Sequence, residues 1–270
     1  MRAALVVSLL VALCLGPVGP GAQAATRSLY LEDLTWTELR DALAAGTTTT
    51  IIIPVGGTEQ SGPQMALGKH NIRAHVLAGR IAAALGDTLV APVLAYVPEG
   101  NISPPTEHMR FPGTISIPES AFKATVAAAA QSFKQAGFHH IVLLGDHGGY
   151  QSALKSVAAE LNHEWAKSTT RAHFIPEYYA ATQTAYVRAL RAKGLSEAEI
   201  GTHAGTADTS LMLAIDPSAV RADQLAAAHG AAVGVLGDAR PSTAALGQLG
   251  VEPIITESVA AIRKARQDQR

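Results

Sequence analysis

The chain contains 270 residues, of which 48% are hydrophobic and 16% are charged, and its 21 Lys and Arg residues nearly balance 22 Asp and Glu residues. This length and apolar content can support one large hydrophobic core and are ordinary for an enzyme built on a buried sheet. Because the charge is near neutral and no basic run occurs, neither nucleic acid nor an anionic membrane is expected as a partner.

The first residues have the layout of a secretory signal peptide. Arg2 precedes an apolar run from Ala3 to Leu15, and Ala22-Gln23-Ala24 supplies a cleavage site of the small-x-small type. The apolar run is too short for a comfortable membrane span. We therefore predict a signal peptide over residues 1–24, cleavage after Ala24 and a periplasmic or secreted protein. The single cysteine lies inside this segment, so the mature protein is expected to contain no disulfide.

The mature chain, residues 25–270, alternates between apolar runs and amphipathic stretches and is expected to form one domain. Strands are predicted at about residues 50–55, 88–96, 140–145 and 171–176, and helices near 71–86, 119–136, 150–167 and 178–193. This alternation predicts an α/β fold in which helices cover both faces of a mostly parallel sheet. The alanine-rich stretches at 124–130 and 225–232 are also expected in helices.

Two predicted connections are longer than such a fold requires. Segment 97–117 is rich in proline and glycine and carries Glu107 and His108, and segment 201–209 carries His203 and Asp208. A long loop without regular structure of its own usually serves a function, so these side chains are candidates for a site. Asp208 has an equally good structural explanation, because a carboxylate stabilises the start of a helix such as the one expected over residues 210–215.

Glu59 and His147 each follow a short β-branched run that ends in glycines. In parallel sheets the loops that leave neighbouring strands converge at one edge, where sites assemble. His70 joins them at the third such junction, although a histidine can fall near a glycine-rich turn by chance. Two imidazoles and a carboxylate commonly bind a divalent metal, so we predict that Glu59, His70 and His147 are metal ligands.

Four blocks occur in order along the chain: IPVGGTEQ at residues 53–60, FPGTIS at 111–116, GDHGG at 145–149, and HAG at 203–205 followed by DTSLML at 208–213. Together these blocks resemble the creatininase (creatinine amidohydrolase) family over about residues 50–220. The resemblance implies a three-layer α/β/α sandwich, assembly into a homo-oligomer such as a hexamer, and metal-dependent hydrolysis of a C–N bond in a cyclic or linear amide.

The resemblance also implies two metals in typical members, and this chain departs from their ligand pattern. Glu59 and His147 match, but Ser61 stands where a His is expected and His70 stands where a bridging Asp is expected. A neutral imidazole cannot bridge two close cations as a carboxylate can. We therefore predict one metal per subunit, Zn²⁺ or alternatively Mn²⁺ or Fe²⁺, with water or Asp208 as a fourth ligand.

A metal-bound hydroxide can attack an amide carbonyl, and departure of the amine requires a positioned acid. Candidate catalytic residues are Asp208, His203, Glu107 and His108. The resemblance places His203 on a catalytic histidine and Thr202 where its Glu partner is expected, which disfavours creatinine itself as the substrate. Candidate substrate-binding residues are Ser61, Gly148, Gly149 and Tyr150.

The sequence thus predicts an exported metal-dependent amidohydrolase that acts on a small-molecule substrate. Two alternatives stay open. Two histidines and one carboxylate can also hold Fe²⁺, so the protein could be a metal enzyme of the lyase or oxygenase type that acts on a small polar substrate. A site that has lost hydrolysis could instead serve a periplasmic binding protein for small molecules.

Overall fold

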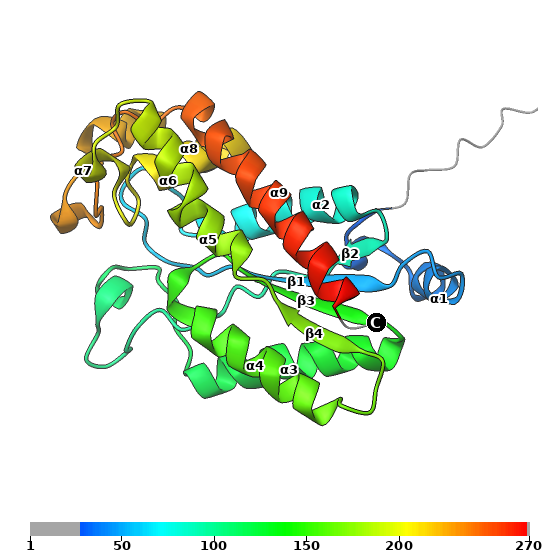
Figure 1. Ribbon diagram of the computed structural model, residues 1–270. Helices are drawn as coiled ribbons and strands as arrows, with labels where there is room; N and C mark the ends of the chain where they lie inside the picture. Colours follow the sequence, from blue (N-terminus) through cyan, green and yellow to red (C-terminus); the bar gives the residue numbers. More distant parts are fainter. Residues whose placement is uncertain (1–27, 269–270) are drawn as a thin grey trace, which may run out of the picture.

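A parallel sheet of four strands, in the order β2-β1-β3-β4, forms the centre of the molecule in this computed structural model, which describes residues 28–268 (Figure 1). The predicted signal peptide lies outside the described residues. The strands are β1 (Thr50–Val55), β2 (Thr88–Val90), β3 (His140–Gly145) and β4 (Arg171–Phe174). Within residues 28–268, no helix has the length and apolar content that a membrane span requires.

Helices cover both faces of this sheet (Figure 1). Since successive strand side chains point to opposite faces, Ile51 and Ile53 of β1 pack in one core and Ile52 packs in another. The first core includes α3 (Glu119–Ala136) and α4 (Gln151–Glu164). The second includes α2 (Lys69–Leu85), α5 (Glu177–Gln183), α6 (Ala185–Ala192), α8 (Thr206–Ile215) and α9 (Ala244–Gln267). The predicted three-layer α/β/α fold is thereby confirmed.

Several elements differ from the sequence prediction. The second strand ends at Val90, although Ala91 and Leu94 still donate backbone hydrogen bonds to β1. The helix expected over residues 178–193 is divided at Thr184 into α5 and α6. Region 225–232 was expected to be helical because of its alanines but forms 3-10 turns. The remaining described helices are α1 (Trp36–Ala44) and α7 (Glu197–Ile200).

The C-terminal helix α9 was not predicted, because Gly247, Gly250 and Pro253 interrupt its helical pattern. The two glycines allow α9 to approach its neighbours closely. A methyl group on Gly247 would overlap the backbone carbonyl of Ser210 in α8, and one on Gly250 would lie 2.8 Å from Leu211 Cδ2. Because α8 also carries Asp208, this close packing fixes the position of a charged side chain at the carboxyl edge of the sheet.

We predict that Gly247→Ala lowers the free energy of unfolding by about 2 kcal/mol, since the added methyl must push α9 away from α8. At an exposed helical position, replacing glycine by alanine would instead raise the free energy of unfolding by about 1 kcal/mol, because alanine has the higher helix propensity. Urea unfolding followed by circular dichroism measures the change. Ala245→Gly, at an exposed position of α9, controls for propensity alone, and a Gly247→Ala variant as stable as the parent would contradict the close packing.

Candidate functional site

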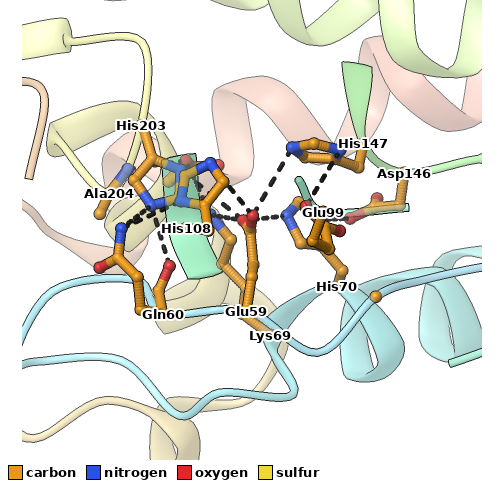
Figure 2. Close-up of polar contacts among 12 residues, drawn as sticks. Glu59, Gln60, Lys69, His70, Glu99, His108, Asp146, His147, His203 and Ala204 are labelled. Atoms are coloured by element: carbon orange, nitrogen blue, oxygen red, sulfur yellow. Dashed lines mark hydrogen bonds and ion pairs between the residues drawn. The ribbon is translucent and has the colours of Figure 1, made fainter. Parts of the chain in front are cut away.

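Glu59 lies at the centre of a polar cluster at the carboxyl edge of the sheet (Figure 2). Its side chain is fully buried. Oε1 accepts a hydrogen bond from His70 Nε2 at 2.7 Å and lies 3.4 Å from Lys69 Nζ. Oε2 lies 3.4 Å from His108 Nε2 and 3.6 Å from His147 Nε2. Burial raises the pKa of Glu59, but His70, Lys69 and His147 outweigh burial and hold the pKa well below its usual range.

Glu99, on the long loop after β2, brings a second carboxyl group next to Glu59. It is buried, and neither of its oxygens has a hydrogen-bond partner among the described residues. Burial and the adjacent Glu59 raise its pKa to about 9. Gly57 permits this approach, because its φ is +150° and a side chain there would lie 2.7 Å from Glu99 Oε1. Two neighbouring buried carboxyl groups indicate that a cation belongs between them.

Glu59, Glu99, His108 and His147 form a group that can hold a metal. One ligand atom from each residue lies within 4.8 Å of the others. Oε2 of Glu59 and both oxygens of Glu99 lack hydrogen-bond partners in the described part of the chain, and a metal ion would satisfy such buried acceptors. Burial lowers the pKa of His147 to about 4, so its imidazole is neutral near pH 7, as a metal ligand must be. The residues present therefore fit a divalent metal.

His70, which was predicted to bind the metal, is not part of this group. Its Nε2 faces Glu59 Oε1 at 2.7 Å, and its Nδ1 faces Asp146 Oδ2 at 2.6 Å. Since both ring nitrogens are bound between two carboxylates, neither is available to a metal. The group that could hold a metal thus contains Glu59 and His147 of the predicted ligands together with Glu99 and His108, and His70 lies beside it between two carboxylates.

Two buried cations of α2, Lys69 and Arg73, were not predicted from the sequence to belong to the site. Lys69 Nζ lies 3.1 Å from Asp208 Oδ2, and Arg73 Nη1 donates to Asp208 Oδ1 at 2.9 Å. Arg73 Nε also donates to Asp146 Oδ2 at 2.8 Å. The available signal was a pair of cations at i and i+4, which places both on one face of the helix start.

Asp208 is the ion-pair partner of both cations. Burial raises the pKa of this carboxyl, but Lys69 and Arg73 outweigh it and hold the pKa well below its usual range. Both oxygens are bound, since Oδ2 also accepts the backbone N–H of Ala204 at 2.9 Å. Asp208 also lines the cavity described below, and its catalytic or ligand role stays a prediction.

His203 lies on the other side of Glu59, beside His108, with ring centroids 4.3 Å apart. Its Nδ1 lies 3.6 Å from Glu59 Oε1, and its Nε2 lies 2.9 Å from the backbone carbonyl of Gln60. A carbonyl only accepts, so this contact requires the proton on Nε2, whereas the side-chain amide Nε2 of Gln60, 3.1 Å from the same nitrogen, requires an acceptor there. Burial and Lys69 lower the pKa of His203 to about 3, which keeps the ring neutral.

A cavity of about 220 Å³ opens next to this cluster. Its lining includes Lys69, His108, His147, Gly148, Tyr179 and His203.

The remaining predicted site residues lie elsewhere around the cluster. Tyr150 is buried and donates to backbone carbonyls of β1 and the residue after it, Ser61 is buried, and Glu107 is exposed. Gly149 donates its backbone N–H to His147 Nδ1 at 3.1 Å and holds that ring. Of the predicted substrate-binding residues, Gly148 lines this cavity, and Ser61, Gly149 and Tyr150 do not.

Comparisons with known proteins agree with this fold. The family described as creatinine amidohydrolase (Creatininase) matches residues 32–262. The mycofactocin precursor peptide peptidase of Mycolicibacterium smegmatis is 28% identical over 221 residues, which cover 73% of this chain and 78% of the relative. The creatinine amidohydrolase of Pseudomonas putida is 27% identical over 207 residues, which cover 74% of this chain and 76% of the relative.

Solved structures give the same result for the fold. The crystal structure of a creatinine amidohydrolase (creatininase) superposes with a TM-score of 0.74 at 23% identity and covers 89% of this chain and 98% of that one. Another structure, described as creatininase Mn, superposes with a TM-score of 0.72 at 24% identity and covers 88% of this chain and 99% of that one. Because the family match extends over most of its length, the chain belongs to the creatininase family of metal-dependent amidohydrolases.

Proposed function

We propose that this protein hydrolyses a C–N bond of a small cyclic or linear amide, using one metal ion per subunit held by Glu59, Glu99, His108 and His147. The observation that carries this proposal is the convergence of unpartnered carboxylate oxygens from Glu59 and Glu99 on two imidazoles within 4.8 Å, at the mouth of a cavity. Buried carboxyl groups that face each other are costly unless a cation binds them, so their placement supports a metal centre.

A bound divalent metal supplies two things: an acidified water and a polarised carbonyl oxygen. The chain's own residues supply the proton path and the orientation. With its proton on Nε2, His203 would present Nδ1, 3.6 Å from Glu59 Oε1, as the acceptor that takes a proton from the attacking water and returns it to the leaving amine. His70 fixes the carboxylate of Glu59 through a 2.7 Å hydrogen bond and is itself held by Asp146. Each group acts within the buried cluster, where electrostatic interactions are strong.

The size of the cavity favours a small substrate, because about 220 Å³ lies below the usual range of ligand pockets, roughly 300–1,000 Å³. The relatives act, by their names, on creatinine and on a mycofactocin precursor peptide. A small amide or the last residues of a short peptide would both fit this space. We favour Zn²⁺, with Mn²⁺ and Fe²⁺ as alternatives, since imidazole and carboxylate ligands suit all three ions.

We further propose that the protein is exported and forms a homo-oligomer. Export rests on the basic residue, apolar run and small-x-small site within residues 2–24. The oligomer rests on the resemblance to the creatininase family.

The ligand set predicts which variants lose metal. Glu99→Gln and His147→Ala should retain none after extensive dialysis, because each removes a ligand atom. His70→Asn should still bind metal but about 10-fold to 100-fold more weakly, since it removes a group that orients a ligand. Elemental analysis per subunit checks this, with exposed His163→Ala as the matched control. A His70→Asn variant that is as metal-free as Glu99→Gln would restore His70 to the ligand set.

Hydrolysis should depend on the metal. Assayed on a panel of lactams, cyclic ureides, formamides and short peptides, the protein should lose activity with a chelator and regain it with Zn²⁺ or Mn²⁺. Glu99→Gln should lower kcat/KM on the order of 100-fold to 1000-fold, because the metal contributes several kcal/mol of transition-state stabilisation. Oxygen consumption with bound iron would indicate an oxygenase instead, and substrate binding without turnover would indicate a binding protein.

A further inference from the structure

Lys69 occupies an unusual position for an ammonium group. It is the first residue of α2, and its side chain is 1% exposed. Nζ lies 3.4 Å from Glu59 Oε1 and 3.1 Å from Asp208 Oδ2, so it bridges two carboxylates that come from different parts of the chain. Burying a charge this completely costs several kcal/mol before pairing is counted. The first turn of a helix is also the end at which the macrodipole disfavours a cation.

The carboxylate of Glu59 is divided between two sets of partners. Oε1 faces Lys69 and His70, whereas Oε2 is turned to His108 and His147 and has no hydrogen-bond partner in the described part of the protein. The ammonium is therefore on one side of Glu59 and the candidate metal group is on the other. Lys69 does not compete with that group for the same oxygen.

Lys69 and Arg73 supply the positive charge that faces the carboxylates of Glu59, Asp146 and Asp208. The side chains of Glu59 and Asp146 are buried, and that of Asp208 is 21% exposed. Without Lys69, Glu59 Oε1 and Asp208 Oδ2 would lose the cation that they share. The cluster would then carry one more negative charge, which favours the binding of a further cation.

Three atoms of types that bind metals lie around the space that Lys69 fills, but they do not come together within 4.8 Å as the atoms of the candidate metal group do. Oε1 of Glu59 and Oδ2 of Asp208 are both in contact with Nζ. Nδ1 of His203 lies 3.6 Å from the same Glu59 oxygen. Two carboxylate oxygens and one imidazole nitrogen are a common ligand set for Zn²⁺ or Mn²⁺.

We propose that Lys69 is an internal cation that takes the place of a second metal ion between Glu59 and Asp208, and so limits the centre to one ion per subunit. This inference rests on the proposed metal centre and adds the residue that sets its stoichiometry. An ordinary structural ion pair would change stability when removed but would not change the number of metal ions.

The test is metal stoichiometry, which does not depend on knowing the substrate. Purified parent and variants are stripped, equilibrated with excess Zn²⁺ or Mn²⁺, and dialysed, and the metal per subunit is measured by elemental analysis and titration calorimetry. Lys69→Met removes the charge at similar length, Lys69→Gln is a second neutral variant, and Lys69→Arg keeps the charge. Exposed Lys155→Met is the matched control. Circular dichroism verifies folding of each.

The parent, Lys69→Arg and Lys155→Met are expected to bind one ion, and Lys69→Met and Lys69→Gln are expected to bind two. Adding Asp208→Asn to Lys69→Met restores the charge sum and removes a ligand, so this double variant should return to one. Two ions in the parent, or one ion in folded Lys69→Met and Lys69→Gln, would overturn the role of Lys69 and leave the hydrolase proposal intact. A parent that binds none would instead overturn the metal centre itself.

Discussion

The buried carboxylate of Glu59 is the group on which the whole site depends. A fully buried anion is tolerated only when partners compensate for the water it has lost. Here the partners come from several segments: Lys69 and His70 from α2, His147 after β3, His108 on the loop after β2, and His203 before α8. Because these partners are distant in the sequence, the carboxylate ties together segments that the apolar core alone would leave unaligned.

Parallel pairing explains how two of these groups meet. In the register of β1 and β3, Val55 pairs with Gly145. The two strands therefore end side by side, and Glu59 and His147 follow them at the same edge of the sheet. The start of α2 then presents Lys69, His70 and Arg73 on one face toward the carboxylates. These side chains are held by anions rather than by the helix dipole, which opposes cations at this end. The cluster is therefore a set of mutual pairings, and removal of one charge leaves another buried without a partner.

The sequence was sufficient for the parts of the site that follow regular structure. Strand periodicity and glycine-rich ends located Glu59 and His147, and the alternation of elements predicted the layers. Glu99 was not singled out, because nothing local determines the path of the proline-rich loop that carries it. His70 was predicted as a metal ligand, but the partner of its second nitrogen, Asp146, is identified only by tertiary structure. Lys69 and Arg73 resemble ordinary helix-surface cations until their burial is known.

The departures from the creatininase pattern make physical sense as a group. The resemblance assigns a histidine where this chain has Ser61 and a bridging aspartate where it has His70, so two ligands of a second ion are replaced by groups that cannot serve it. Lys69 and Arg73 supply a counter-charge to Asp208 from within the chain. The helix start that carries His70 in place of the bridging aspartate also carries both cations, so one ligand replacement and the positive charge lie together at the beginning of α2.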